Sequence, residues 1–282
     1  MSLFIRFLLV FLLTTGSAQA LVKLLGFNMF TAAILMWSVG ISALITLRWA
    51  KIPLSALGWK WGATRYHVIA FVLPLVYGGI AYPLAAALGL VKFPVEESAK
   101  QIVSFAGLGD APLFPAMAAT FVMLSFSGLI NSMSTALGEE IGWRGLVTPL
   151  LTSHWGFIAA TLVTGLMWAG WHMPLIFFSD YNAGGTKLFE ALSFTCMIVS
   201  ISGPMAWLRL KSGSLWPAAM LHAAHNLFLQ NFFDPLSGRG DNAITMVGEF
   251  GVILAAVSLL VSLPFWWAGA RLARTQFPPA NA

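Results

Sequence analysis

Long apolar runs separated by short polar loops dominate the pattern of this 282-residue chain. Runs of about 20 apolar residues recur, and each is long enough to cross the roughly 30 Å hydrocarbon core of a membrane as a helix. The alternating strands of about ten residues that mark a membrane barrel do not occur. The pattern therefore predicts an all-α fold, a polytopic membrane helical bundle of about eight transmembrane helices.

The apolar runs give the expected spans: about 1–22, 30–47, 66–90, 115–136, 155–178, 188–208, 215–233 and 244–270. The first run ends in Ser17-Ala18-Gln19-Ala20, a small-residue stretch that resembles a signal-peptide cleavage site. Apolar residues resume at Leu21, which favours an uncleaved first span. No linker or internal repeat interrupts the pattern, so residues 1–282 are expected to form a single integral membrane domain.

Composition agrees with a membrane protein, because 59% of the residues are hydrophobic and only 9% are charged. Soluble domains carry about 25% charged residues. The net charge of +5 does not indicate nucleic acid, since the basic residues are spread over short loops and form no stripe. The loop 48–65 has four basic residues and no acidic one, whereas 91–112 is the more acidic loop. By the positive-inside rule, both termini are expected in the cytoplasm, with the protein in the cytoplasmic membrane.

Against this apolar background, the charged stretch 138–145 is the main anomaly. A charge at the bilayer centre costs about 2.5–3.5 kcal/mol on insertion scales, so it persists for function or as a satisfied pair. Arg144 follows Glu140 by four residues, the favourable spacing for a helical ion pair. Glu139 lies about 100° around the helix from Glu140. We therefore expect Glu140 to be neutralised by Arg144 and Glu139 to face the interior.

Further polar groups fall within other apolar runs. His172 has Trp168 one turn before it, and His222 and Asn226 share one helix face. A single intramembrane His or Asn is more often a helix–helix hydrogen-bond partner than a catalyst. Glu139, His172, His222 and Asn226 come from three different spans, however, and helix–helix hydrogen bonding explains the four together less readily. Glu139 and His172 could deprotonate a water, and an imidazole with a carboxamide could donate hydrogen bonds to an oxyanion.

The same residues leave a metal hypothesis open. Glu139, His172 and His222 are a plausible zinc set with an open position for water. The soluble metalloprotease signature H-E-x-x-H is missing from the sequence. Because Asn226 is a poor zinc ligand and no third histidine lies on a matching face, we slightly prefer a glutamate mechanism and keep Zn²⁺ as the possible cofactor.

The remaining ionisable groups in or near the apolar runs are expected to be structural, interfacial or solvated. His225 shares the His222 face only in part, and the lone Cys196 is expected to be a small core or lipid-facing residue. Groups interpreted as interfacial or solvated are His67, His154, Glu96, Glu97, Glu190 and Glu249.

Three ordered motifs carry a resemblance to a known family. They are Glu139-Glu140-x-x-x-Arg144, Trp168-x-x-x-His172 and His222-x-x-x-Asn226. They resemble the motifs of CAAX prenyl endopeptidase-type intramembrane proteases, the CPBP (CAAX protease and bacteriocin-processing) family, in its bacterial form. Trp168 stands where the second motif usually has Phe. The resemblance is strongest over 115–230, which we expect to be the catalytic core.

The resemblance implies an intramembrane endopeptidase that cleaves a membrane-associated protein or peptide at a site opening towards the cytoplasm. Glu139 and His172 would activate a water, and His222 and Asn226 would form the oxyanion site. The supporting residues would be Glu140, Arg144 and Trp168. Expected partners are the lipid bilayer and a membrane protein or a lipidated or peptide substrate, with no nucleic acid.

Two functions of other classes compete with proteolysis. A non-catalytic, peptide-binding or immunity-type membrane protein could use the same fold, although a pure binder has no need for the full motif set. A transporter or proton relay also places Glu and His in the membrane. The absence of an inverted repeat in the sequence weakens that alternative.

The expected spans create a difficulty of depth. Glu139 falls near the inner end of the fourth span and His172 towards the outer end of the fifth, about 25 Å from its start at 1.5 Å per residue. These groups can meet only if the chain bends. We expect a break near Gly138 or Gly142, and a fifth span that starts deep on the cytoplasmic side or is tilted.

Overall fold

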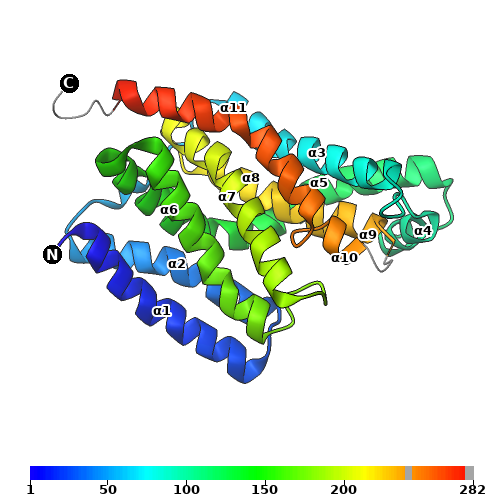
Figure 1. Ribbon diagram of the computed structural model, residues 1–282, viewed down its shortest axis with the longest axis horizontal. Coiled ribbons are helices and arrows are strands. Elements are labelled where there is room, and N and C mark those ends of the chain that lie inside the picture. Colours follow the sequence, from blue (N-terminus) through cyan, green and yellow to red (C-terminus); the bar gives the residue numbers. More distant parts are fainter. Residues whose placement is uncertain (239–242, 277–282) are drawn as a thin grey trace.

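The computed structural model describes residues 1–238 and 243–276, and every regular element in these ranges is helical. Figure 1 shows the bundle. The long helices are α1 (Leu3–Leu25), α2 (Met29–Trp49), α3 (Thr64–Ala87), α5 (Leu113–Glu140), α6 (Thr148–Phe178), α7 (Lys187–Ser212) and α11 (Val252–Gln276). The shorter ones are η1 (Leu54–Leu57), α4 (Glu96–Phe105), α8 (Trp216–His225), α9 (Asp234–Leu236) and α10 (Ala243–Met246). Two π-helical segments are η2 (Ile141–Val147) and η3 (Asn226–Phe233). The all-α prediction is confirmed.

The described helices include six stretches that are long and apolar enough to cross a membrane, with Leu113–Phe178 counted as one stretch of 66 residues. A straight helix of that length would measure about 99 Å, three times the hydrocarbon thickness, so it must fold back. Large apolar side chains on the outer faces are exposed, for example Leu13 at 73%, Phe126 at 72% and Ile130 at 74%. Such a surface suits lipid and not water, and it indicates an integral membrane protein.

The fold-back occurs at Gly156, whose φ of 74° and ψ of 173° are non-helical. This region of backbone space is essentially restricted to glycine. The chain then returns along itself, because Thr148 and Thr164, each eight residues from Gly156, come within 3.5 Å of each other through their hydroxyl oxygens. Residues 113–178 therefore form a hairpin of two antiparallel arms.

Close helix packing explains the glycines of the central stretch. A Cβ added to Gly40 of α2 would lie 2.4 Å from the carbonyl oxygen of Gly138, and one added to Gly142 would lie 2.6 Å from Val39 Cγ1. Small residues at these positions let α2 approach the backbone at the end of α5 and the start of η2. The central stretch is thus held by direct backbone contact.

The two ends of the bundle differ in charge. The N-terminus and the C-terminal part of α11 lie at one end (Figure 1), where Leu215 N donates to Gly58 O at 2.8 Å. We call this the basic end, because it carries Arg6, Arg48, Lys51, Lys60, Arg65, Arg209, Lys211, Arg271 and Arg274.

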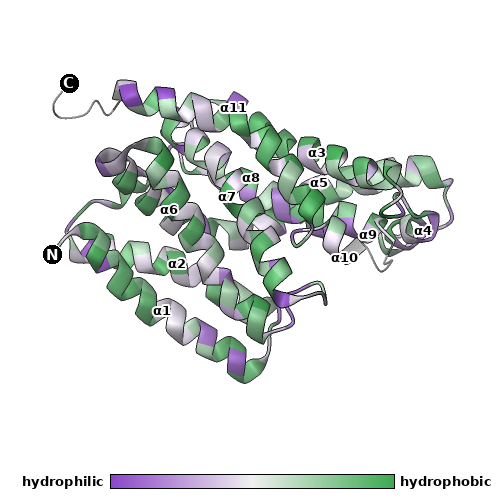
Figure 2. Ribbon diagram, viewed as in Figure 1, coloured by the Kyte–Doolittle hydropathy of each residue, from purple (hydrophilic) through white to green (hydrophobic). Residues whose placement is uncertain are grey.

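At the opposite end, which we call the acidic end, Val95 N donates to Leu236 O at 2.9 Å. Among the described residues, this end carries the basic side chains Lys23, Lys92, Lys100 and Lys187 and the acidic side chains Glu96, Glu97, Asp110, Asp180, Glu190, Asp234 and Glu249. Hydrophobic residues run along α1, α3 and α11 between the two ends (Figure 2).

Besides the fold-back at Gly156, the structure departs from the expected spans in three places. Residues 91–112, expected as a plain loop, contain helix α4. The seventh span changes from α-helix to π-helix at Asn226. The last helix starts at Val252 and not near Ile244, and part of the expected loop before it, residues 239–242, lies outside the described residues.

Candidate active site

One cavity of about 350 Å³ is lined by all four residues expected to be catalytic, Glu139, His172, His222 and Asn226. They come from α5, α6, α8 and η3. The first three side chains are at most 9% exposed. The structure therefore brings together the groups that the sequence places in different apolar runs.

Glu139 is positioned by Trp168. The indole Nε1 donates a hydrogen bond to Glu139 Oε2 at 2.5 Å, across the two arms of the hairpin. The same ring lies 5.1 Å from the ring of His222 and 6.3 Å from that of His172, centroid to centroid. Trp168 is thus in contact with three of the four candidate groups, and its N–H holds one carboxylate oxygen of Glu139 in place.

Glu140 points away from this contact, as helix geometry predicted. Its Oε1 accepts from Arg144 Nη1 at 2.8 Å and from His222 Nδ1 at 2.9 Å. Arg144 also donates to Ser202 Oγ at 3.0 Å and lies over the Trp168 ring, 4.3 Å from its centroid. The pairing of Glu140 with Arg144 agrees with the expectation from their spacing. The bond to His222 was not anticipated, and it links the second carboxylate to the site.

His172 has a defined tautomer. Its Nδ1 lies 3.0 Å from the carbonyl oxygen of Trp168. A carbonyl only accepts, so Nδ1 carries the proton and donates. In the neutral ring, Nε2 is then an acceptor, able to receive a hydrogen bond or a proton from a water.

Asn226 begins η3 at the point where α8 ends. Among the hydrogen bonds within the described chain, none involves its side-chain amide, so this group is free to bind a ligand in the cavity. The segment η2 likewise begins one residue after Glu140. Both breaks from α-helical geometry occur directly at the motifs, and π-helical segments are frequent at functional sites.

The hairpin resolves the difficulty of depth and corrects the expected span boundaries. Glu139 does not lie at the inner end of a span, because the helical arm continues for 17 residues to Gly156. His172 lies 16 residues after Gly156 on the returning arm. The two side chains are therefore at nearly the same depth. The expected break near Gly138 or Gly142 was wrong in position: the chain stays helical through η2, and the turn lies at Gly156.

A second buried polar cluster borders the cavity and was missed by sequence reasoning. His225 Nε2 lies 3.1 Å from Glu249 Oε1, and Tyr77 Oη lies 2.6 Å from His225 Nδ1. Tyr181 Oη and Gln230 Nε2 donate to Glu249 at 2.8 and 3.0 Å. Glu249, expected to be interfacial, is instead only 7% exposed and forms the centre of this cluster.

The charge state of the cluster follows from its contacts. Burial alone would raise the pKa of Glu249, but the hydrogen bond and charge of His225, with the hydrogen bonds of Tyr181 and Gln230, lower it to about 2. Burial, and then the charge of Glu249, raise the pKa of Tyr181, which remains a protonated donor. Glu249 is therefore an ionised acceptor with three side-chain partners.

The other ionisable residues have structural contacts. Glu190 is fully buried and accepts from the backbone N–H groups of Ala183 and Gly185 at 3.1 and 2.6 Å. His67 stacks on Trp61 with ring centroids 3.9 Å apart. These contacts hold loops in place and lie apart from the cavity.

The arrangement was compared with the expected zinc set. Within residues 1–238 and 243–276, no three His, Cys, Asp or Glu side chains lie where they could hold one metal ion. Nδ1 of His172 and Nδ1 of His222 are engaged by Trp168 O and Glu140, an arrangement that metal-ligating histidines also have. Zinc binding by Glu139, His172 and His222 stays a prediction.

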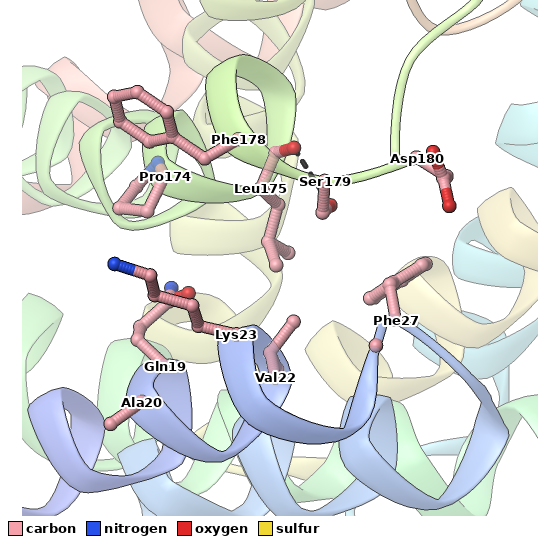
Figure 3. A pocket seen from close by; sticks show the side chains of 11 residues that line it. Gln19, Ala20, Val22, Lys23, Phe27, Pro174, Leu175, Phe178, Ser179 and Asp180 are labelled. Atoms are coloured by element: carbon pink, nitrogen blue, oxygen red, sulfur yellow. Dashed lines mark hydrogen bonds between the residues drawn. The ribbon is translucent and has the colours of Figure 1, made fainter.

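A second hollow, of about 530 Å³, adjoins the cavity between α1 and the end of α6 (Figure 3). Phe27 and Leu175 line both spaces. Gln19 supports this contact, since its Nε2 donates to Trp171 O at 3.1 Å. Lys23 and Asp180 are charged groups at its border.

Residues 120–228 match the family described as type II CAAX prenyl endopeptidase, Rce1-like. The candidate site therefore lies in an Rce1-like region. CAAX prenyl protease 2 of Methanococcus maripaludis is similar as well, 31% identical over 125 residues, which is 43% of this chain and 45% of that protein. The aligned part is less than half the length of this curated relative. The family resemblance inferred from the three motifs is confirmed for the Rce1-like region, and all four candidate residues fall inside it.

Proposed function

We propose that this chain is an intramembrane endopeptidase, which hydrolyses a peptide bond of a membrane-associated protein or peptide. The observation that carries the proposal is the shared cavity, in which Glu139, His172, His222 and Asn226 converge. The match of residues 120–228 to a family of prenyl endopeptidases supports the same reaction class.

Glu139 and His172 would activate the attacking water. Trp168 occupies Glu139 Oε2, which leaves Oε1 to accept a proton from the water. His172 Nε2, unprotonated because Nδ1 donates to Trp168 O, would accept the other hydrogen of the same water and orient it. As the water oxygen bonds to the scissile carbonyl carbon, Glu139 takes its proton, and it returns this proton to the leaving amine nitrogen when the C–N bond breaks.

His222 and Asn226 would stabilise the oxyanion of the tetrahedral intermediate. Asn226 supplies an amide N–H, and His222 supplies Nε2–H when its ring carries both protons. The Glu140 carboxylate, 2.9 Å from Nδ1, compensates that ring charge. With Glu139 and Glu140 ionised and Arg144 and His222 positive, the buried site is neutral in total. Such balance is what makes charges tolerable at membrane depth.

Substitution of the two water-activating residues tests the proposal. Cells carrying wild-type protein, Glu139→Gln or His172→Ala are compared by proteomics of their membrane fractions. Both variants should insert normally and lose cleavage by at least about 100-fold, the usual contribution of a positioned acid–base group. The matched controls are Glu97→Gln and His154→Ala, which alter exposed residues outside the cavity. Full activity in both site variants would leave a non-catalytic, peptide-binding role as the explanation of the cavity.

A separate experiment addresses zinc. Purified protein is assayed on a peptide identified by the proteomic comparison, after chelation and after addition of Zn²⁺. Because no three described His, Cys, Asp or Glu side chains are placed to hold one metal ion, we expect unchanged activity in both conditions. Loss on chelation with recovery on zinc would replace the glutamate mechanism with a metal-dependent one.

A further inference from the structure

The active-site cavity has a mouth at one end of the bundle. Glu139, Trp168 and His222 form its buried interior, whereas the lining residues Met29 and Asn231 are exposed. Met29 is the first residue of α2, the residue farthest along that helix from Trp49 at the basic end. Asn231 lies only three residues before Asp234, next to the contact of Leu236 with Val95. The mouth therefore opens on the acidic end.

The hollow between α1 and α6 extends the mouth on the same side. It is bordered by Lys23, near the end of α1, and by Asp180, directly after α6 (Figure 3). Its wall shares Phe27 with the cavity. Both openings are thus separated from the basic end by most of the length of α1, α2 and α6.

The distribution of charge fixes which end is expected in the cytoplasm. Among the described residues, the basic end carries nine Lys and Arg side chains and no Asp or Glu, whereas the acidic end carries four Lys and most of the acids. Short loops rich in Lys and Arg remain on the cytoplasmic side during insertion. The acidic end would then lie outside the cytoplasm.

We propose that the cavity opens towards the extracytoplasmic side and accepts protein segments that leave the membrane there. This differs from the cytoplasmic opening that the family resemblance implies. The orientation stands on charge and cavity position, and the choice of substrate rests in addition on the proposed endopeptidase function. Substrates would be membrane proteins with a flexible segment next to a span on the outer side, not proteins cleaved at a cytoplasmic C-terminus.

The mouth carries groups that suit an extended peptide. Asn131 of α5 and Asn231 of η3 are exposed amides that line the cavity. Each offers a donor and an acceptor for peptide backbone groups that are no longer paired within a helix.

Thiol labelling tests the orientation without any need for activity. The sole cysteine, Cys196, is changed to Ser, and a matched pair of hydroxyl-to-thiol variants is made at exposed positions outside the long helices, Thr186→Cys at the acidic end and Ser55→Cys at the basic end. A membrane-impermeant maleimide is applied to intact spheroplasts. Thr186→Cys should be labelled at least about ten times more than Ser55→Cys, and permeabilisation should make the two equal. The reverse ratio, or equal labelling before permeabilisation, would overturn the proposal.

Mapping of cleavage sites tests the second half of the proposal, which concerns the choice of substrate. In membrane proteins that accumulate uncleaved in Glu139→Gln cells, the sites should lie on the extracytoplasmic side of a span. Exclusively cytoplasmic sites would overturn this half of the proposal. If no cleavage sites are found, the endopeptidase function fails, while the labelling ratio still decides the orientation.

Discussion

Glu139 and Glu140 are neighbours in sequence but have different partners. Helix geometry separates adjacent side chains by about 100°, and the structure places Glu139 against Trp168 and Glu140 against Arg144 and His222. The i,i+4 spacing made the Arg144 pair predictable. The His222 contact joins residues 82 positions apart, and local periodicity holds no information about it. In the proposed function, Glu140 would therefore act through His222, as a positioning residue.

Glu140→Gln should separate this role from that of Glu139. The neutral amide no longer compensates an imidazolium at His222, so oxyanion stabilisation weakens. We expect kcat to fall about 10- to 100-fold with KM nearly unchanged, less than the loss in Glu139→Gln. Steady-state kinetics on the identified peptide provide the measurement. The control is Glu190→Gln, a change at a buried glutamate outside the cavity, which should alter folding yield and leave kcat intact. An unchanged kcat in Glu140→Gln would contradict the proposed action of Glu140 through His222.

The cluster of Tyr77, His225, Tyr181 and Glu249 shows the limit of sequence reasoning at this scale. Its bonds span 148, 24 and 68 positions. Each residue has an ordinary local explanation, since Tyr and Glu at the end of an apolar run suit a membrane interface. His225 did give a signal of the cluster in the sequence. Together with His222 it places two imidazoles in one apolar helix, and each imidazole needs a hydrogen-bond partner there.

Tyr181→Phe should weaken the cluster without removing the chemistry. The hydroxyl donates to an ionised carboxylate at 2.8 Å and ties the loop after α6 to the loop before α11. Hydrogen bonds to charged groups contribute about 1.5–3 kcal/mol, so we expect a clearly lower melting temperature in detergent. Because the Tyr181 hydroxyl donates to Glu249 and has no role in the proposed water activation, kcat should change by less than about threefold. The control is Tyr66→Phe, because the Tyr66 hydroxyl only accepts a hydrogen bond from Arg65. A kcat loss in Tyr181→Phe similar to that of His172→Ala would instead place Tyr181 in the reaction.

At the scale of elements, the apolar runs located the long helices but not their connections. Runs of about 20 apolar residues predict spans directly, because each must bury its backbone within itself in lipid. The arm that continues from Glu139 to Gly156 was missed, since Arg144, Ser153 and His154 look like a loop when membrane depth is unknown. The π-helical form of η2 and η3 was also unpredictable. Only packing against α2 and around the cavity selects it over an α-helix.

Gly156→Ala tests the turn that sets the depth of His172. Alanine at φ 74° and ψ 173° is strained, which costs about 1–3 kcal/mol. Gly170→Ala is the matched control, because an added Cβ meets no atom within 4 Å at either glycine and only Gly156 has a positive φ. We expect Gly156→Ala to lower both the melting temperature and the activity, and Gly170→Ala to change neither. Equal behaviour of the two variants would show that the turn geometry is not limiting.

At the scale of the whole molecule, the arrangement is a polar centre inside an apolar exterior. Among the buried charged groups, Glu139, Glu140, Arg144 and Glu249 lie in or beside the cavity, whereas the lipid-facing surface is made of large apolar side chains. This arrangement is the reverse of that in a soluble protein, and it follows because lipid surrounds the molecule in place of water. In lipid an exposed apolar side chain has no cost, and a charged one must turn inward to a partner. The same reasoning makes the exterior the place where a single charge should be most harmful.

Phe126→Lys should therefore impair insertion. Phe126 lies near the middle of α5 and is 72% exposed, so a lysine there would face the hydrocarbon core at a cost of about 2.5–3.5 kcal/mol. Phe105→Lys is the matched control, since Phe105 is 94% exposed but ends the short helix α4, outside the candidate spans. The amount of protein resistant to carbonate extraction from membranes should fall several-fold for Phe126→Lys and remain near wild type for Phe105→Lys. If both variants insert equally well, the face of α5 that carries Phe126 does not contact lipid, and a partner chain or a water-filled space must cover it.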